Sequence, residues 1–413
     1  MMGTAHRMAV AAVAAAAALS YVQTAQATNG AYSHAFGTRA KGMAGAGTAL
    51  AQDAIAAGVN PAAMAFVGNR VDVGIEAFMP DREYSSNGAA FPITGAESDN
   101  KLFLVPDLGV NYEISEKGSL GISIAGNGGM NTEYPKTVFA GGSIPTGVDL
   151  SQMFVGVTYA HKLTPNHAIG VTPVFAAQRF KAYGLEPFAG QSTSPGNLTG
   201  RGYDYSYGGG FALGYQGKLS DTFRVGVGYI SHMYMTPFDK YKGLFAEQGD
   251  FDIPPVLNAG VAWEFLPGWT VAADYQRIFY EDVKSISNVH TNLPLNLGSN
   301  GGGGFGWQNM NVAKLGLQWV ATDALTLRAG ASYNTSPFEG DQILFNVLAP
   351  AVVRVHASVG ATWAFNENHE VSFAYTRAFS NTKSGQGPAA FGGALVNLRM
   401  DQHDLAVGYT YKW

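Results

Sequence analysis

The chain of 413 residues contains no cysteine, which excludes a disulfide framework and a thiolate metal site. Charge is also scarce, because Asp, Glu, Lys and Arg make up 13% of the residues, against about a quarter in an ordinary soluble domain. The formal net charge of −5 gives no reason to expect a nucleic acid as a partner. Glycine is abundant instead, with 53 residues. This composition favours a chain whose outer surface meets lipid.

Long apolar runs are confined to the start of the chain. Arg7 precedes an apolar stretch at residues 8–19, and Ala-Gln-Ala at residues 25–27 has the form of a cleavage site. These features predict a secretory signal peptide over residues 1–27, with the mature chain beginning near Thr28. Since no later run reaches the 18 apolar residues of a transmembrane helix, the sequence predicts an exported protein that crosses no membrane with helices.

From residue 70 onward, apolar and polar residues alternate in segments of roughly ten residues, the length of a transmembrane strand. In the last segment, Leu405, Val407 and Tyr409 share one face with Tyr411 and Trp413. Fourteen segments are expected, an even number as a single-chain bacterial barrel requires. They are residues 71–79, 108–114, 119–125, 153–162, 168–179, 205–217, 223–231, 257–265, 269–279, 310–320, 325–333, 352–365, 370–379 and 401–413.

The connections between these segments alternate in length, which indicates short turns on one rim and long loops on the other. An outer-membrane barrel has this arrangement, whereas a soluble β-sandwich has no reason to sort its loops in this way. The short connections are 115–118, 163–166, 218–221, 266–268, 321–324 and 366–369, and the long ones are 81–105, 126–151, 181–204, 233–255, 280–309, 334–351 and 381–400.

Alternation also assigns side chains to the two faces of the wall. Val353, Val359 and Trp363 are expected to face lipid, whereas Arg354 and His356 are expected to face the lumen. Glycine and polar residues therefore line the predicted interior. Aromatic residues near strand ends suit the interfacial girdle of such barrels.

Residues 28–69 precede the first strand and do not alternate. They are rich in Gly and Ala, and residues 48–58 predict a short helix with Thr48 as its N-cap and Gly58 after its end. A segment of about forty small residues cannot bury a core of its own. It can pack inside a barrel, where polar walls satisfy its backbone, so residues 28–69 are predicted to be a plug in a barrel of residues 70–413.

At this point the chain resembles the FadL family of outer-membrane transporters for long-chain fatty acids and other hydrophobic compounds. The resemblance covers the mature chain and rests on Asn60-Pro61-Ala62, which is similar to the family's hatch motif, and on residues 126–134, which are similar to its kinked third strand. It implies a plug that acts as a hatch, gated by Asn60, Pro61 and Ala62 near that kink. Taken alone, Asn-Pro is a common opening of a turn.

The glycines in residues 126–134 interrupt an alternating strand. Glycine weakens strand pairing and permits a bend, although the strand could equally end there and a loop begin. The resemblance implies an inward kink at Asn127, Gly128 and Gly129, through which a hydrophobic substrate leaves sideways into the bilayer. Such a route keeps an alkyl chain out of water, which is worth roughly 0.8 kcal/mol per methylene.

A fatty acid also needs a basic partner for its carboxylate. The resemblance suggests Arg179 for this role, but strict alternation places it on the outer face unless Pro173 marks a bulge. Lys314 and Arg328 face inward by alternation, as does Arg354, and the ordinary alternative is that such cations pair with lumen acids. Because a charged hydrogen bond contributes only about 1.5–3 kcal/mol, the pocket could also accept neutral hydrocarbons.

The long loops carry more apolar residues than solvated loops need, among them Phe238 and Phe245. In the family such loops form a first docking groove, although packing of the loops on themselves explains these residues equally well. By resemblance to outer-membrane barrels, Trp413 would be recognised by the barrel-assembly machinery.

The sequence therefore predicts an all-β, monomeric barrel in the bacterial outer membrane, surrounded by its lipid, that passively moves hydrophobic molecules. The nine histidines show no metal spacing, and no nucleophile is set beside a base, so no metal, cofactor or catalytic residue is expected. Long-chain fatty acids are the expected substrate, with aromatic or aliphatic hydrocarbons as the alternative within the family. The rivals are a hydrophilic diffusion porin, which should have an open lumen, and an outer-membrane hydrolase.

Overall fold

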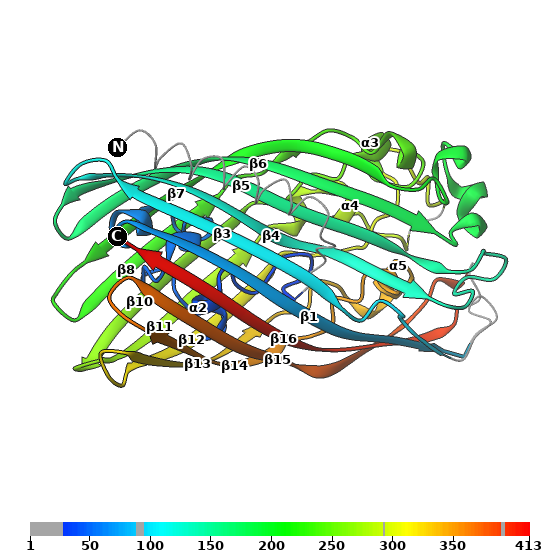
Figure 1. The fold of residues 1–413 in the computed structure, drawn as a ribbon. Helices are drawn as coiled ribbons and strands as arrows, with labels where there is room; N and C mark the ends of the chain where they lie inside the picture. Colours follow the sequence, from blue (N-terminus) through cyan, green and yellow to red (C-terminus); the bar gives the residue numbers. More distant parts are fainter. Residues whose placement is uncertain (1–27, 88–94, 292–293, 390–392) are drawn as a thin grey trace.

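The computed structural model describes residues 28–87, 95–291, 294–389 and 393–413, and the predicted signal peptide lies outside this part. Its strands form one antiparallel sheet of sixteen, of which β2 and β9 have two residues each. The other fourteen close into a barrel because β1 pairs with β16, from Arg70 opposite Lys412 to Ser86 opposite Val396. Figure 1 shows the tilted strands from the side. Among the described residues, no helix is long and apolar enough to cross a membrane.

The strands are β1 (Arg70–Ser86), β2 (Ala96–Glu97), β3 (Phe103–Glu113), β4 (Gly118–Tyr134), β5 (Thr146–Thr164), β6 (His167–Tyr183), β7 (Asp204–Lys218), β8 (Phe223–Ile230), β9 (Tyr234–Met235), β10 (Val256–Leu266), β11 (Trp269–Ile278), β12 (Met310–Val320), β13 (Leu325–Asn334), β14 (Val355–Ala364), β15 (His369–Gln386) and β16 (Leu395–Lys412). The α-helices are α2 (Thr38–Lys41), α3 (Ala246–Gly249), α4 (Lys284–Ser287) and α5 (Ile343–Asn346). The 3-10 helices are η1 (Ala54–Gly58), η2 (Pro61–Ala65), η3 (Glu186–Gln191), η4 (Pro195–Asn197), η5 (Asp239–Tyr241), η6 (Tyr280–Asp282) and η7 (Gly340–Gln342).

All fourteen predicted strands are confirmed, but several are longer than the sequence indicated. The predicted loop 126–151 is mostly strand, because β4 continues to Tyr134 and β5 begins at Thr146. Alternation of apolar side chains marks only the part of a strand that meets lipid, whereas ladder hydrogen bonding continues beyond it. The long connections after β1, β4, β6 and β15 are therefore shorter than predicted, whereas those after β8, β11 and β13 are not, and the placement of the long connections on one rim holds.

The two faces of the wall agree with the alternation within the strands. On β14, Val359 and Trp363 are each 57% exposed, whereas the side chain of His356 is fully buried in the lumen. Two predictions failed at the end of this strand, because β14 begins only at Val355. Val353 is buried instead of facing lipid, and the Arg354 guanidinium donates to the hydroxyl of Tyr333 on the outer wall instead of entering the lumen.

Residues 28–69, called the N-terminal segment below, lie inside the barrel towards the short-turn end (blue in Figure 1). The predicted helix over residues 48–58 is wrong, since only a 3-10 helix forms at Ala54–Gly58. Its N-cap is Asp53, whose carboxylate accepts from two backbone amides of that helix, Ile55 and Ala56, at 3.1 Å each. Thr48 does not cap a helix because its hydroxyl donates to Asp274 on β11.

Lumen glycines hold the N-terminal segment close to the wall. At ten of them, a Cβ atom would lie between 2.0 and 2.9 Å from an atom of residues 38–64. At Gly228, for example, it would lie 2.0 Å from the carbonyl oxygen of Val59. We call these residues the glycine collar: Gly109, Gly121, Gly170, Gly214, Gly226, Gly228, Gly316, Gly330, Gly360 and Gly408. They occupy nine of the fourteen barrel strands, so the absence of side chains all round the wall makes room for the segment.

Candidate functional site

Carboxylates of the barrel wall bind the N-terminal segment through its backbone and its cations. One oxygen of Asp274 accepts from the backbone amides of Gly47 and Thr48 at 2.8 Å each and from the Thr48 hydroxyl at 2.7 Å. Lys41 pairs with Glu76 on β1 at 2.6 Å, with both side chains buried. Because a charged hydrogen bond contributes roughly 1.5–3 kcal/mol, these contacts hold the segment firmly against the wall.

The two lumen cations predicted to bind ligand contact the N-terminal segment instead. Lys314 donates to the carbonyl oxygen of His34 at 3.0 Å, and Arg328 donates to the side-chain oxygen of Gln52 at 3.0 Å and to the Thr362 hydroxyl at 2.7 Å. Neither has a carboxylate within 4.0 Å among the described residues. Their partners are neutral oxygens, so the expected pairing with lumen acids is also absent at these two residues.

The Asn60-Pro61-Ala62 turn lies against β6 and β7 and not at the third-strand kink, contrary to what the resemblance implied. The Asn60 side chain donates to the carbonyl oxygens of Thr48 at 2.8 Å and Tyr215 at 3.0 Å, and its own oxygen caps the amide of Ala62 at 3.1 Å. The close approach is possible because Gly170 and Gly214 present no side chain there. The turn therefore attaches the N-terminal segment to β6 and β7.

The kink itself contains a β-bulge at Asn127. The pairing of β4 with β5 shifts register between Gly126 and Gly128, so Asn127 is the extra residue, and β4 then continues as a strand. Its side chain donates to the Gln152 side chain at 3.0 Å. A bulge bends the strand that carries it, which redirects the remainder of β4.

Beyond this bulge β4 is no longer paired with β3. The β3–β4 ladder ends at Asp107 opposite Ala125, while residues 103–106 of β3 still pair with β1 and residues 128–134 of β4 still pair with β5. Pro106 has no amide hydrogen to donate to a ladder at this point. We call the unpaired stretch between residues 103–106 and 126–130 the wall gap, since Glu133 further along β4 is hydrogen-bonded to Ser98 and Asp99.

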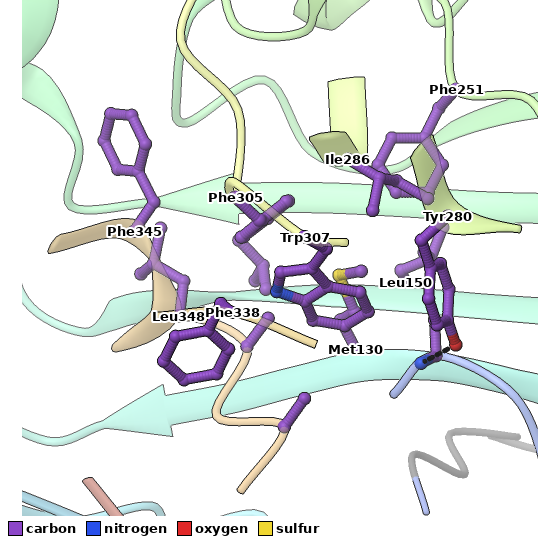
Figure 2. Close-up of a cluster of buried hydrophobic side chains, with 14 of the residues drawn as sticks. Met130, Leu150, Phe251, Tyr280, Ile286, Phe305, Trp307, Phe338, Phe345 and Leu348 are labelled. Atoms are coloured by element: carbon purple, nitrogen blue, oxygen red, sulfur yellow. Dashed lines mark hydrogen bonds between the residues drawn. The ribbon is translucent and has the colours of Figure 1, made fainter. Parts of the chain in front are cut away.

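The start of the N-terminal segment covers part of the wall gap from inside. Tyr32 forms a bridge with Gly128, the amide of Ser33 donates to the carbonyl of Asn127 at 2.6 Å, and the amide of Gly129 donates to the carbonyl of Ala31 at 3.1 Å. These residues therefore take the place that β3 vacates. Since the Ala31 amide also donates to the Tyr280 hydroxyl at 2.9 Å, the same residues reach the long loop between β11 and β12 (dashed line in Figure 2).

Above the N-terminal segment the lumen is filled by apolar side chains from the strands and the long loops. Figure 2 shows Trp307 of one loop beside Met130 of β4, and Phe338 of another loop belongs to the same cluster. The Trp307 indole donates to the Asn346 side chain at 2.6 Å, and its ring meets that of Tyr280 edge to face at 5.0 Å. Loop residues thus form an apolar cluster over the plug.

A small cavity lies within this cluster, next to the wall gap. Its volume is about 10 Å³, which is room for roughly one water molecule. We call it the apolar chamber, and a substrate could enter only if lining residues moved. It is lined by Gly30, Phe78, Arg82, Gly129, Met130, Asn131, Trp307, Ala349, Pro350, Ala351 and Met400.

Arg82 is the cation of this chamber, and the sequence analysis missed it. Its side chain is 4% exposed, and the guanidinium donates to the backbone carbonyls of Asn100 and Asn131. Its Nε has no hydrogen-bond partner and no carboxylate lies within 4.0 Å among the described residues. The alternation of β1 places Arg82 on the inner face when it is continued past Met79, but the predicted strand stops at residue 79.

A larger cavity of about 490 Å³ opens at the short-turn rim. It lies between Leu50, Ala51 and Phe66 of the N-terminal segment and the ends of strands β7, β8, β10, β11 and β12. Lys218 and Glu264 are among its polar lining residues. Its charged lining differs from that of the apolar chamber. Water can enter this end of the lumen as far as the N-terminal segment.

Arg179 lies on the outer wall, so it does not reach a lumen pocket. The pairing of β6 with β7 runs without a register shift from His167 to Phe180, which means that Pro173 introduces no bulge. Arg179 therefore stays on the face of Ile169 and Val171, which are 46% and 40% exposed. The resemblance implied that Arg179 is a pocket arginine, but side chains alternate without a break along β6, and this alternation places Arg179 on the outer wall.

Phe238 and Phe245 are buried and form no open groove on the loops. Both contact Phe180 of β6, with ring centroids 5.6 and 4.7 Å away, and Phe245 also packs on Phe251 at 4.7 Å. Their exposed fractions are 0% and 5%. In this state the loops pack on themselves, so a docking groove would form only if these loops moved apart.

The long loop between β11 and β12 carries a buried histidine that makes its stability depend on pH. His290 is fully buried against Phe345, and burial lowers its pKa to about 4, from near 6.5 in an unfolded chain. Between these values only the unfolded loop takes up a proton. The stabilisation present above pH 6.5 is therefore lost as the pH falls to 4, by roughly 3 kcal/mol.

We expect the amides of residues 286–291 and 302–307 to lose protection from hydrogen exchange as the pH falls through that window, after correction for intrinsic exchange. The His290→Asn variant keeps a donor for the Gly304 carbonyl, to which the His290 ring lies at 3.1 Å, but does not titrate. Its loop should show protection that is independent of pH. A wild-type loop equally protected at pH 7 and pH 4 would contradict the assignment.

A closed barrel with short turns on one rim, an aromatic lipid-facing wall and a lumen filled by its own N-terminal segment defines an outer-membrane transport barrel. The family model described as "Outer membrane protein transport protein (OMPP1/FadL/TodX)" matches residues 18–412, so the chain belongs to this family. The protein is therefore an outer-membrane transport protein, and its family consists of transporters and not of enzymes. Among the described residues, no group of His, Cys, Asp and Glu could hold a metal ion.

Solved structures share the fold at low sequence identity. The toluene transporter TodX of Pseudomonas putida is 19% identical, with 92% of this chain and 99% of that chain covered and a TM-score of 0.69. A FadL homologue of Pseudomonas aeruginosa is 18% identical, with coverage of 93% and 99% and a TM-score of 0.70. The toluene transporter TbuX of Ralstonia pickettii is 18% identical, with coverage of 92% and 99% and a TM-score of 0.65. No curated protein matches the chain.

Proposed function

We propose that this protein passively carries hydrophobic molecules across the outer membrane, and that its preferred substrates are long-chain fatty acids. Arg82 is the observation that supports a substrate with a carboxylate group. It is a buried cation in the apolar chamber and has no acidic partner within 4.0 Å among the described residues. Phe78, Met130 and Met400 of the same chamber would contact the alkyl chain. Burying that chain is worth roughly 0.8 kcal/mol per methylene, so the tail supplies most of the affinity.

In this proposal the N-terminal segment acts as a hatch and the wall gap as the exit. The segment is fastened by Asp274 and by the Asn60 turn, so it blocks the direct path to the short-turn rim. The apolar chamber adjoins Gly129 and Met130 at the wall gap. A molecule bound there reaches lipid by displacing Ala31–Ser33 from β4, which avoids the charged cavity at the other end.

Neutral hydrocarbons are the second candidate. Two of the structures with the same fold, TodX and TbuX, are toluene transporters, and the guanidinium of Arg82 already donates to two backbone carbonyls. A neutral ring would need only the apolar lining of the chamber. Arg82 therefore separates the two candidates.

The test compares uptake of a long-chain fatty acid and of toluene by the wild type and by Arg82→Met and Arg82→Lys variants in proteoliposomes. Losing a charged hydrogen bond of about 1.5–3 kcal/mol should lower fatty-acid uptake by Arg82→Met roughly tenfold or more and leave toluene uptake unchanged. Arg82→Lys should retain most fatty-acid uptake. Equal losses for both substrates would assign Arg82 a structural part only, and unchanged fatty-acid uptake would favour the neutral substrates.

A further inference from the structure

Four cations gather on the outer surface of the barrel around Tyr203. The Arg179 guanidinium lies 4.8 Å from the centre of the Tyr203 ring, and the Lys181 ammonium lies at the same distance. The ammonium of Lys240 donates to the Tyr203 carbonyl at 2.5 Å, and Arg201 lies exposed two residues before that tyrosine. Three of these cations thus contact one residue at the upper ends of β6 and β7.

The height of this cluster on the wall matches the head groups of the outer leaflet. β6 runs from the short-turn rim to the long-loop rim, and its outward residues Ile169, Val171 and Phe175 are 40–50% exposed to lipid. Arg179 follows Phe175 by four residues, or roughly 13 Å along the strand. Its neighbour across the ladder, Tyr205, is 55% exposed and belongs to the aromatic girdle that marks the interface.

Among the described residues, Arg179 and Lys181 are not paired with a carboxylate, as is also true of Arg277 and Arg354 on the outer wall, whereas other cations there are paired with acids. Elsewhere near the long-loop rim, Lys101 pairs with Asp81 at 3.2 Å and Arg399 pairs with Glu83 at 3.4 Å. Among the described residues, Arg179 and Lys181 have no carboxylate within 4.0 Å. Asp149 faces Lys181 across the ladder, but its Oδ2 accepts from the Tyr203 hydroxyl at 2.5 Å.

A second acid near the cluster is also engaged. The Asp204 carboxylate accepts from the backbone amide of Lys240 at 2.8 Å. One guanidinium nitrogen of Arg179, Nη2, is buried and has no hydrogen-bond partner. A buried donor of this kind lacks an acceptor, which the oxygen of a bound ligand could supply.

We propose that Arg179 and Lys181, with Tyr203 between them, bind a phosphate group of a phosphorylated glycolipid of the outer leaflet. The Cα atoms of two residues that are two positions apart on one strand lie roughly 7 Å apart, and the long side chains of Arg179 and Lys181 can converge from there on one phosphate. Arginine and phosphate form paired, charge-assisted hydrogen bonds, and an aromatic ring holds the two side chains in place. The acyl chains of the glycolipid would pack on the exposed rings of Phe175 and Tyr207, which stack at 6.2 Å.

The test measures binding of purified lipopolysaccharide to the barrel in a neutral detergent. The Arg179→Gln/Lys181→Gln double variant should bind about tenfold more weakly than the wild type. The matched control is Lys101→Gln/Arg399→Gln, which removes the same charge from paired cations of the same leaflet and should bind as the wild type does. The Arg179→Lys/Lys181→Arg variant keeps both positive charges and should bind as the wild type does. It serves as the control for substitution at these two positions.

Two further binding measurements identify which chemical group is bound. Dephosphorylated lipopolysaccharide should bind the wild type as weakly as the intact form binds the double variant, and inorganic phosphate at millimolar concentration should not displace the glycolipid. Equal binding by the wild type and the double variant, equal losses in the control variant, or displacement by inorganic phosphate alone would each overturn the proposal.

Discussion

Deleting Asn127 should reduce substrate uptake about 30-fold while the barrel still folds. Without the extra residue, β4 loses its bulge and can stay in register with β3 over residues 103–106. Two or three new ladder hydrogen bonds at about 1 kcal/mol each would hold the wall gap closed, and every 1.4 kcal/mol lowers the open population about tenfold. Uptake in proteoliposomes is the measurement, with heat-modifiable migration on a gel as the check on folding.

The control for this deletion is Asn127→Gly, which keeps the number of residues and therefore the bulge. It removes only the hydrogen bond from Asn127 to Gln152 and should leave uptake close to that of the wild type. Because the chain has no cysteine, a cysteine introduced at the inward-facing Val105, which is 5% exposed, reports whether the gap has closed, through its rate of labelling from the lipid side. Normal uptake through a closed gap would show that substrate leaves by another path, such as the cavity at the short-turn rim.

The Gly228→Val variant should make the barrel leak small sugars. Its Cβ would lie 2.0 Å from the carbonyl oxygen of Val59, so either the N-terminal segment or β8 must shift. Overpacking of this kind costs about 1–3 kcal/mol, which raises the population of a displaced segment roughly tenfold to a hundredfold. Liposome swelling in sugar solutions measures the leak, since the wild type should admit sugars slowly.

The matched control is Gly190→Val in the loop between β6 and β7, where no atom lies within 4 Å of the added Cβ. It should leave both swelling and folding unchanged. A tight Gly228→Val barrel would show that the segment moves as a whole without opening a path. Fast sugar entry through the wild type itself would instead favour the hydrophilic porin over the transporter.

Much of the fold could be predicted because each membrane-facing strand carries its own signal. A period of two within residues such as 353–363 is local, and it needs no knowledge of the neighbouring strands. The alternation of apolar and polar residues ends where a strand leaves the lipid, so it does not predict the ends of β4 and β5 beyond the membrane. Val353 and Arg354 failed for the opposite reason, since the alternating pattern there begins at residue 352, three residues before the strand does.

The site was less predictable because its contacts join distant parts of the chain. Ala31 and Ser33 bind Asn127 and Gly129, and nothing in the sequence of either stretch names the other. Arg82 is a lining residue of a chamber formed by three strands, two loops and the N-terminal segment, and alternation along β1 alone does not reveal these partners. Arg179 shows the opposite case, since the local alternation placed it correctly on the outer wall and only the resemblance pointed inward.

The glycine collar also fixes the order in which the protein can be assembled. The N-terminal segment is synthesised before any strand, yet the surface it needs comes from strands as late as β16, which contributes Gly408. Contacts so distant along the chain form late, because their loop-closure entropy must be met first. The segment that is made first is therefore the last to become ordered, and a newly closed barrel passes through an unsealed intermediate until it docks.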